Sequence, residues 1–412
     1  MRSPLRWYLA SSAFYLIPGG LQSVMFPWLV AVYLHESPAR VGFAQMAGQI
    51  PMLFLILVGG LLGDRLDQRA LLIRLHLLMM LPPLCMAALV RADLVVYEVL
   101  IAWAFLGGVL GSFVAPARDA MLSRVAGRDV QRVVMLVTAV QFGVQILGFA
   151  LGSVADRVGP AALMCVQALC MGLCAYTTRF LPRADLAPVA INAAKQRFGT
   201  QLRQMLRDIL EGLAIAWRSA AIRPVILLTF SQGVFFAGAY MVVLPLMVRD
   251  IYGSGASGIA MAFGANMLGT VLTIFVLMWR GGIERPGRAL IVGAILSCCV
   301  LSLLHTELPE WAFYLVSLFW GMCGGVSMTM SRSIVQEAAP ASHRARLMSV
   351  FSLGMMGGMP FGSALLGWCV GIIGARNAVL VPVFGMAFMV LLIAANSNLW
   401  SVRRSQPVSV AA

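Results

Sequence analysis

The stretch "GGLLGDRLDQRALL", residues 59–72, decides the fold. Two acids and two arginines lie within Asp64–Arg69, and almost wholly apolar runs flank them at 39–63 and 70–90. A helix needs about 20 apolar residues to cross a bilayer, and each flanking run reaches that length. The stretch is therefore predicted to be a charged turn between two membrane-spanning helices.

Composition extends this prediction to the whole chain. The 412 residues are 60% hydrophobic and 11% charged, whereas a soluble chain carries about 25% charged residues. The sequence is therefore predicted to be an all-α polytopic membrane protein with twelve transmembrane helices in two pseudo-symmetric six-helix bundles. The predicted spans are 8–34, 39–63, 70–90, 95–118, 133–155, 160–181, 224–248, 256–279, 288–306, 311–335, 347–373 and 377–399.

The longest polar stretch divides the chain into two halves. Residues 1–182 are predicted to form the first six-helix bundle, 183–223 a cytoplasmic linker, and 224–412 the second bundle with a short cytoplasmic tail. Within the linker, apolar residues from Phe198 to Trp217 follow helical spacing, and charged residues occupy the other face. An amphipathic helix on the membrane surface is therefore expected there.

The basic residues give the orientation. If both termini are cytoplasmic, most of the 30 basic residues fall on the cytoplasmic side. The net charge of +14 then reflects loops held at an anionic inner leaflet, and nucleic acid is not needed as a partner. The exceptions on the far side are Arg40, Arg91, Arg157, Arg249 and Arg376.

The sequence lacks the motifs of several enzyme classes. The only lysine, Lys195, follows alanine, so a Walker A loop is absent, as is a G-x-S-x-G motif. The eight cysteines lie in apolar runs and are expected to be small buried residues. No histidine pair has metal-ligand spacing on a shared face. The chain is therefore predicted to be no enzyme and to need no cofactor or metal.

The two halves echo each other at a fixed offset. The first half contains Gly111, Arg118 and Arg132. The same residue types stand 214 positions later, at Gly325, Arg332 and Arg346. The segment "DRLDQRALL" (64–72) has a fainter partner in "ERPGRALI" (284–291). Such echoes indicate duplicated halves around a central site. The predicted second-half counterparts of the charged turn are Glu284, Arg285, Arg288 and Arg332.

The charged turn resembles the loop between helices two and three of the major facilitator superfamily, whose pattern is G-x-L-a-D-R-x-G-R-K. Gly60, Leu62, Asp64, Arg65 and Arg69 stand at or near the matching places. The residues that depart from the pattern are Asp67 and Gln68, and the aspartate is a feature of the branch that resembles the enterobactin exporter and drug-efflux permeases. Further stretches resemble the family at 115–122, 206–224, 343–353 and 357–367.

The resemblance implies that Asp64 faces the start of helix eleven and latches the cytoplasmic side shut. The implied members of this gate are Gly60, Asp64, Arg65, Arg69, Arg118 and Asp119. For the arginines, a purely topological role as anchors of the turn is an equal alternative. The arginine common in the family's helix four falls near Trp103 here and is missing.

The resemblance also implies a function. It points to a secondary active transporter of a bacterial inner membrane that exports a small amphipathic metabolite, siderophore-like, or a drug. Protons are a possible coupling partner, the lipid bilayer is the surroundings, and a monomer is expected. Two alternatives remain: a non-transporting membrane sensor of the same fold, and an importer of a small metabolite.

Uncharged polar residues inside the apolar spans point to a transport path. Gln141 and Gln145 lie four residues apart on one helix face and are the preferred substrate contacts. The alternative is interhelical hydrogen bonding, worth about 0.6 kcal/mol for each bond. The full set of cavity candidates is Gln22, Gln49, Gln141, Gln145, Gln232, Asn266 and Thr329.

Glycines and a proline mark candidate packing and hinge positions. Gly148 and Gly152 match the antiporter pattern G-P-x-x-G-G, although Phe149 and Ser153 replace its proline and its last glycine. Close helix packing explains this glycine pair equally well. In the eleventh span, a gating hinge and a static kink are both open for Gly358, Pro360 and Gly362.

Overall fold

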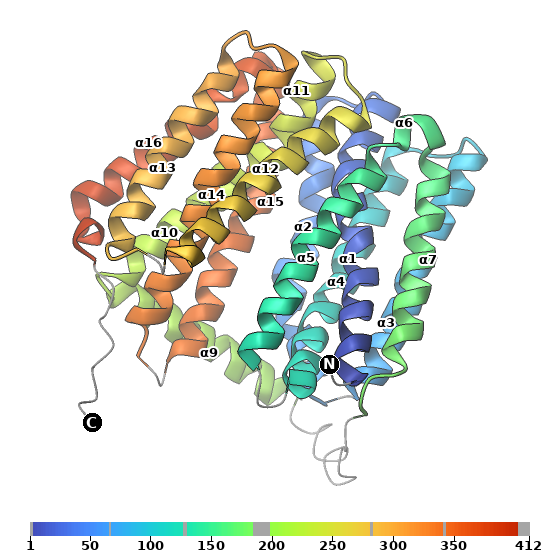
Figure 1. Ribbon diagram of the computed structural model, residues 1–412, viewed down its shortest axis with the longest axis horizontal. Coiled ribbons are helices and arrows are strands. Elements are labelled where there is room, and N and C mark those ends of the chain that lie inside the picture. The colour runs from blue at the N-terminus through green and yellow to red at the C-terminus, as the bar shows by residue number, and fades with distance from the viewer. Residues whose placement is uncertain are drawn as a thin grey trace. The chain divides into compact units, whose positions relative to one another are not determined.

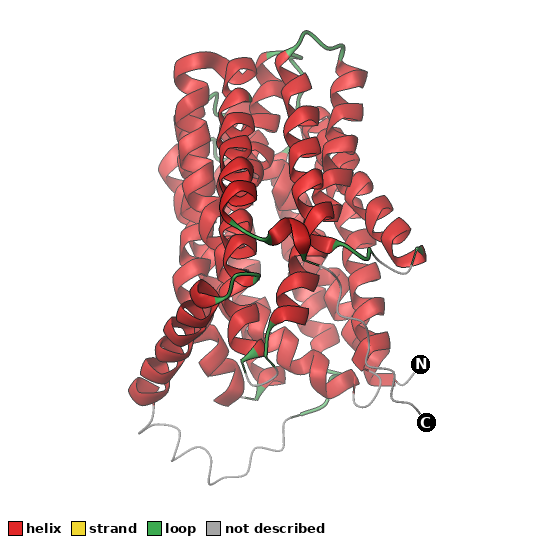
Figure 2. Cartoon of the chain, turned by 90° about the vertical axis from the view of Figure 1, so that its left-hand side faces the viewer, coloured by secondary structure: helices red, strands yellow, loops and turns green. Residues whose placement is uncertain are grey.

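The computed structural model describes residues 3–65, 67–126, 130–183, 198–280, 283–340 and 343–402. Within these ranges every regular element is helical and no strand occurs, as Figure 2 shows. Nine of the helices in the described part are long and apolar enough to cross a membrane. The prediction of an all-α polytopic membrane protein is confirmed.

The first six predicted spans coincide with helices (Figure 1). Asp67 caps the third helix by accepting the backbone N–H of Arg69 at 3.2 Å. Pro160 starts the sixth spanning helix, a position where its missing N–H costs nothing. The elements are α1 (Ser3–Trp28), the π-helical turn η1 (Leu29–Tyr33), α2 (Pro38–Arg65), α3 (Gln68–Arg91), α4 (Tyr97–Ala126), α5 (Val130–Gly152), the short α6 (Ala155–Val158) and α7 (Pro160–Thr178).

The second half of the sequence is also helical throughout its described part. Its first predicted span, 224–248, is interrupted by two π-helical turns, which the apolar pattern could not show. The elements are α9 (Phe198–Arg218), α10 (Ile222–Gln232), η2 (Gly233–Ala237), η3 (Ala239–Val243), α11 (Leu244–Asp250), α12 (Ala256–Trp279), α13 (Pro286–Ser302), η4 (Leu303–His305), α14 (Glu310–Ala338), α15 (Arg344–Ala378), α16 (Leu380–Asn396) and η5 (Leu399–Ser401).

The helices form two compact units that do not follow the order of the sequence. Unit 1 comprises Met1–Met205 and Leu244–Gly264, and unit 2 comprises Leu206–Val243 and Ala265–Ala412. The segment Leu244–Gly264, which the sequence analysis assigned to the second bundle, is thus a part of unit 1. The chain passes out of unit 2 directly after the π-helical turn η3, and π-helical turns are frequent at functional sites.

In unit 1, α1 packs against α5 and α7, α2 against α4, and α3 against both α4 and α7 (Figure 1). The contact between α1 and α5 is close because glycines face each other. A Cβ on Gly148 would lie 2.7 Å from the Cα of Gly20. Buried side chains of α1, α3 and α4, including Tyr8, Leu72 and Met121, form a core cluster near the N-terminal end of α1.

In unit 2, α13 packs against α14 and α16, and α15 packs against α10 and η2. The glycines of α15 again permit close approach, since a Cβ on Gly358 would lie 2.7 Å from the backbone nitrogen of Val234. Helix α15 is continuous through the buried Pro360, and its departure from helical geometry lies at Gly374, with φ 78° and ψ 160°. The proline therefore introduces no break in α15.

The amphipathic helix predicted in the linker is present as α9. Arg346 at the start of α15 forms ion pairs with Asp208 at 2.8 Å and Glu211 at 2.9 Å. The opposite face of α9 exposes a row of apolar side chains, as expected of a helix that lies on a membrane surface. These residues are Leu206, Leu210, Leu213 and Trp217.

The expectation that all cysteines are buried is wrong for Cys85, Cys165 and Cys299, which are exposed. An apolar residue in a spanning helix can face the protein interior or the acyl chains of lipid, because both surroundings are apolar. Hydropathy alone therefore cannot tell these two faces apart.

Candidate functional site

Asp156 holds the beginning of α12 at one end of unit 1. Its Oδ2 accepts the backbone N–H of Ala256, the first residue of α12, at 2.7 Å, and its Oδ1 accepts the indole N–H of Trp28 at 2.8 Å. The first N–H groups of a helix have no partner within the helix and carry its positive dipole end. A carboxylate at this position is therefore both a hydrogen-bond acceptor and a favourable charge.

Gly255 makes this close approach possible. A Cβ at that position would collide with both carboxylate oxygens of Asp156. Glycine is needed here for lack of a side chain and not for backbone freedom. The contact between Asp156 and Ala256 is thus specified at two positions, a hundred residues apart in the sequence.

Arg249 caps a helix end of the opposite polarity. The Nη1 group of Arg249 donates to the carbonyl oxygens of Ala31 and Glu36, both at 3.0 Å. The Ala31 carbonyl belongs to η1 at the end of the first spanning helix, and Glu36 lies in the turn that follows. In this turn His35 has a φ of 53° and the N–H of Glu36 donates to the Val30 carbonyl. A cation is favourable at a helix C-terminus, where unpaired carbonyls carry the negative dipole end.

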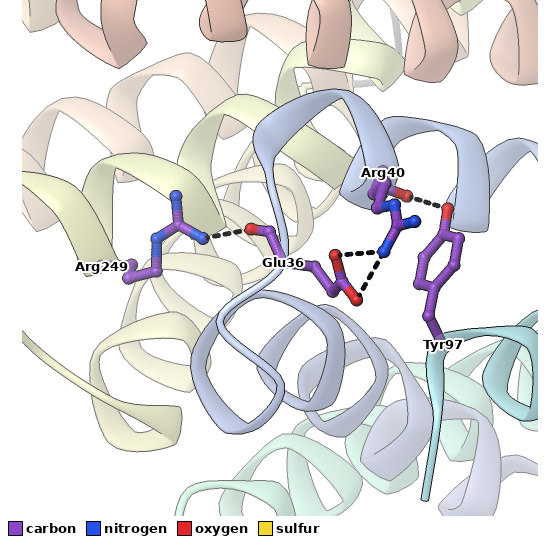
Figure 3. Close-up of polar contacts among 4 residues, drawn as sticks. All are labelled: Glu36, Arg40, Tyr97 and Arg249. Atoms are coloured by element: carbon purple, nitrogen blue, oxygen red, sulfur yellow. Dashed lines mark hydrogen bonds and ion pairs between the residues drawn. The ribbon is translucent and has the colours of Figure 1, made fainter.

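Figure 3 shows how this end of the molecule is held in place. The backbone carbonyl of Glu36 accepts from Arg249, while its carboxylate accepts from Arg40 Nη1 at 3.0 and 2.9 Å. The guanidinium of Arg40 lies 4.7 Å from the ring centroid of Tyr97, and the Tyr97 hydroxyl donates to the Arg40 carbonyl at 2.7 Å. The start of α4 thereby fixes the turn that Arg249 binds.

The first cap consists of Asp156 with Trp28 and Ala256, and the second cap consists of Arg249 with Ala31 and Glu36. We call these two caps together the helix-end clamp. Both join helices of the first half of the sequence to the segment 244–264. Both consist of a charged side chain on a helix end, so they can be made and broken without covalent chemistry. Each charged hydrogen bond contributes about 1.5–3 kcal/mol, at the lower end where the group is exposed, as Asp156 is.

The helix-end clamp was not predicted from the sequence, although a signal for it is present. The segment "GSVADRVG" (152–159) repeats the order of "GLLGDRLD" (60–67), with glycine, aspartate and arginine at the same three places. It also has the last glycine of the superfamily pattern, which the earlier turn lacks. The motif thus occurs twice in the first half, and the second copy holds Asp156.

The predicted cytoplasmic gate is only partly described. Gly60, Asp64 and Arg65 end α2, and their side chains lie outside the described part of the structure. Arg69 lies in the first turn of α3 and is half-buried, and Asp119 is exposed. Arg118 is buried, and its guanidinium carbon lies 4.5 Å from the Tyr15 ring centroid and 5.9 Å from that of Tyr8.

A buried polar cluster lies beside these rings. His76 is wholly buried, and the Sγ of Cys174 lies 3.5 Å from each of its ring nitrogens. Ser11 contacts both Cys174 and Thr178. These residues were not predicted as a site, since a single histidine in an apolar helix is a weak signal. Among the described residues, no three His, Cys, Asp or Glu side chains are grouped so that they could hold a metal ion.

The cavity candidates of unit 1 differ in their surroundings. Gln22 accepts a hydrogen bond from Gln167 at 3.0 Å. This bond between two helices is the alternative to a contact with substrate. Gln141 is exposed, whereas Gln145 and Gln49 are half-buried. The preferred pair, Gln141 and Gln145, therefore stays a prediction.

In unit 2, two of the candidates make hydrogen bonds to backbone. Asn266 donates to the Ser317 carbonyl at 3.1 Å, and Thr329 donates to the Gly325 carbonyl of its own helix at 2.8 Å. Gln232 differs, because its Nε2 is buried and has no hydrogen-bond partner among the described residues. Such a donor is suited to bind a polar group that enters from outside the protein.

The predicted second-half counterparts of the charged turn do not gather into one cluster around a single partner. Glu284 and Arg332 are exposed, and Arg285 precedes α13. Arg288 lies with its guanidinium carbon 5.4 Å from the Trp400 ring centroid. Arg118 is buried but Arg332, at the equivalent position, is exposed. The sequence echo is thus not matched by equal environments.

Each unit contains glycines that pack closely against a neighbouring helix, and unit 1 also contains an apolar cavity. Gly148 and Gly152 face α1, at Gly20 and Val24, and Gly362 faces the backbone of Val234. A cavity of about 330 Å³ between α3 and α4 is lined by apolar residues that include Met86 and Trp103. Trp103 packs against Phe26 at 5.9 Å between ring centroids, so an aromatic contact occupies the place of the family's arginine.

Comparison with known proteins identifies the family. A family model described as a transmembrane secretion effector matches residues 6–409. No curated protein gives a significant match. Solved structures with a similar fold include three transporters of different substrates.

The nucleoside transporter NupG has a TM-score of 0.71 and 16% identity, with coverage of 95% of this chain and 98% of that chain. A POT family transporter in complex with a thioalcohol-conjugated peptide has a TM-score of 0.70 and 12% identity, with 95% of each chain covered. A D-xylose–proton symporter has a TM-score of 0.66 and 16% identity, also with 95% of each chain covered. At these identities the likeness shows a shared fold and carries no information about the substrate.

Proposed function

Because the chain belongs to the transmembrane secretion effector family of the major facilitator superfamily, we propose that it is a proton-coupled secondary active exporter. Its substrate is a small amphipathic molecule, a siderophore-like metabolite or a drug. The family's description as a secretion effector supports the outward direction. The likeness in fold to a D-xylose–proton symporter supports protons as the coupling ion.

The observation that carries this proposal is the helix-end clamp. An alternating-access transporter needs contacts that close one side of the path and are broken once in each cycle. Asp156 and Arg249 provide such contacts, because each binds a helix end through hydrogen bonds of 2.7–3.0 Å. Each cap has two such bonds of about 1.5–3 kcal/mol each, and a substrate opens the clamp only if it binds the open state more tightly by at least the energy of the broken bonds.

The proposed topology assigns the two copies of the motif to opposite membrane faces. With both termini in the cytoplasm, Asp64 lies at the inner face and Asp156 at the outer face. The helix-end clamp then closes the outer side of the path, and the turn at Asp64 closes the inner side. A transporter with one latch at each face can alternate by exchanging which latch is closed.

The substrate path that fits this scheme has few charges. The candidate contacts are amides and hydroxyls, of which Gln232 has an unsatisfied buried donor. Such a lining favours a substrate with polar acceptor groups on an otherwise apolar body. Gln141 and Gln145 of unit 1 are the proposed substrate contacts, and the protein is proposed to act as a monomer.

The test compares the culture media of cells that carry the wild type and the variant Asp156→Ala at equal membrane levels. We expect at least one amphipathic metabolite to be about tenfold lower in the medium of the variant, because loss of both bonds removes more than 1.4 kcal/mol from the closed outer state. The same metabolite should accumulate inside the variant cells. Everted vesicles then measure its transport with and without a proton gradient.

The variant Asp156→Asn is the matched control for charge, since it keeps an acceptor oxygen at the same place. We expect an intermediate loss of export. A metabolite that wild-type cells deplete from the medium would show import instead. Identical media from wild-type and Asp156→Ala cells would contradict export altogether.

A further inference from the structure

A buried polar cluster in unit 1 has a chemistry that the helix-end clamp does not use. We call Ser11, His76, Cys174 and Thr178, with the neighbouring Tyr15 and Arg118, the histidine cluster. These residues come from α1, α3, α4 and α7. His76 and Thr178 are wholly buried, and Arg118 and Ser11 are buried as well.

The hydrogen bonds of the histidine cluster leave His76 weakly paired. The Thr178 hydroxyl donates to the Cys174 carbonyl at 2.7 Å, so it accepts from Ser11 Oγ at 3.0 Å. The Cys174 thiol donates to the Ser11 carbonyl at 3.2 Å. The sulfur is then only a weak acceptor for one N–H of His76 at 3.5 Å. No carboxylate among the described residues hydrogen-bonds or ion-pairs with the ring.

Arg118 and His76 share one neighbour. The guanidinium carbon of Arg118 lies 4.5 Å from the centroid of the Tyr15 ring, and the His76 ring centroid lies 5.8 Å from it. Arginine stays charged in proteins, and an aromatic face stabilises its charge. A second cation at His76 would be repelled strongly in this buried place, since a low dielectric strengthens the repulsion.

The titratable and charged groups around His76 are few. Helix α1 contributes Tyr15, α7 contributes Cys174, and α4 contributes Arg118, beside which Asp119 is exposed. The side chains at 60–65 of α2 lie outside the described residues. Among the described residues, the charged side chain next to the ring that His76 contacts is thus the cation Arg118.

We propose that His76 binds the coupling proton, and that a protonated His76 and an Arg118 held over the Tyr15 ring exclude each other. The proton binds to a ring nitrogen of His76 when Arg118 leaves the ring, and it dissociates when Arg118 returns. This proposal rests on the proton-coupled transport proposed above, and it names the residue that would carry the proton.

Helix α1 provides a physical connection from this site to the helix-end clamp. Ser11 and Tyr15 lie in the first half of α1, while Trp28 ends it and Ala31 follows in η1. Trp28 and Ala31 are partners of Asp156 and Arg249. A change at the Tyr15 ring can thus reach the clamp through one helix, which contains Pro18 and Pro27.

The first test measures the protonation of His76 and requires no substrate. The chain has only 4 histidines, so the ring nitrogen signals of ¹⁵N-histidine-labelled protein in nanodiscs can be assigned with His76→Gln. At about pH 6, where a free imidazole is largely protonated, we expect His76 to be neutral in the wild type. In Arg118→Gln its protonated fraction should rise about tenfold or more, and in the charge-keeping control Arg118→Lys it should not change. An unchanged His76 signal in Arg118→Gln would overturn the proposal.

The second test measures the response of the clamp to pH. Ala260, buried in the first turns of α12, is replaced by Cys, and its labelling rate by a membrane-impermeant maleimide is compared with that of a free thiol. We expect the relative rate to rise about threefold or more from pH 8 to pH 6 with His76 present, and to be flat in His76→Gln. The control Cys165→Ser changes an exposed cysteine of the same helix, α7, and should keep the pH response.

The outcomes separate this proposal from the proposed function. If His76→Gln keeps the full pH response, His76 is not the proton-binding residue, whatever the protein transports. If the histidine signals and the labelling behave as expected while no metabolite is exported, proton binding at His76 stands and the export proposal fails.

Discussion

The two halves of the sequence contain the same backbone turn with different chemistry. Before α7 the chain turns at Gly159, with φ 82° and ψ 155°, and within α15 it turns at Gly374, with φ 78° and ψ 160°. Three residues before Gly159 lies Asp156, whereas three residues before Gly374 lies Gly371. The two turns thus share the glycine-dependent backbone and differ in the acid.

The difference assigns the turns different partners. Asp156 reaches the first N–H of α12, in the segment 244–264. After Gly374, Arg376 forms an ion pair with Glu307 at 2.9 Å and its carbonyl contacts His305 at 3.4 Å, both within unit 2. One turn therefore binds a segment from the other half of the sequence, and the other turn stabilises its own half. A shared backbone geometry therefore does not imply a shared role for the two turns.

The largest effect is expected from Gly255→Ala, which tests the first turn at its point of closest approach. The added Cβ would collide with both Asp156 oxygens, so the cap on α12 cannot form. We expect Ala260→Cys to be labelled about tenfold faster and export to fall to a similar extent. Gly264→Ala is the matched control, because a Cβ there meets nothing within 4 Å. Equal effects of the two substitutions would mean that the close approach has no special role.

The next largest effects are expected from Gly159→Ala and Gly374→Ala. Together they separate the contribution of the backbone turn from that of the Asp156 side chain. Gly159→Ala and Gly374→Ala each force a side chain into a backbone region that is nearly restricted to glycine, at a cost of about 1–3 kcal/mol. We expect similar losses of thermal stability for both variants. Only Gly159→Ala should also accelerate labelling at Ala260→Cys, because it displaces Asp156. Acceleration by Gly374→Ala as well would show that the two turns act alike.

A smaller effect is expected from Arg249→Gln. The substitution removes the charge from a helix C-terminus and weakens two bonds to carbonyls, at a cost of about 0.6–1.4 kcal/mol. We expect labelling of Ala260→Cys to rise about threefold to tenfold. Arg40→Gln is the control that disturbs the neighbouring turn but keeps Arg249. If Arg40→Gln has the larger effect, the turn at Glu36 matters more than the cap.

The smallest effect is expected from Glu307→Gln in the second turn. Glu307 is 89% exposed, and surface ion pairs contribute about 0–1 kcal/mol. Thermal stability, export and labelling should all stay close to those of the wild type. A loss of export in this variant would give the second turn a role that its geometry does not suggest.

Much of the fold could be predicted from the sequence, and little of the site. Every predicted span coincides with helix in the described part, because length and hydropathy decide membrane insertion residue by residue. The charged turn at 59–72 was found because charge inside apolar sequence is conspicuous. Asp156 was not predicted from the sequence because its role depends on a contact with Gly255 and Ala256. These are ordinary residues about a hundred positions away in the sequence.

His76 shows a similar limit. Its neighbours Tyr15, Arg118 and Cys174 come from three other helices, and no spacing in the sequence connects them. The amide candidates show the same limit, since Gln22 was a candidate for the cavity lining and is hydrogen-bonded to Gln167 in the structure. A polar residue in a spanning helix must find a partner, and the sequence does not say whether that partner is protein or substrate.

The sequence by itself determined that this protein is helical and crosses a membrane many times. These properties follow from the cost of exposing polar groups to lipid, which is local and additive along the chain. Only the tertiary structure decided that the segment 244–264 belongs with the first half, that Asp156 and Arg249 cap helix ends, and that His76 lies beside Tyr15. These depend on contacts between distant helices, and the energy of such contacts exists only after the helices have packed.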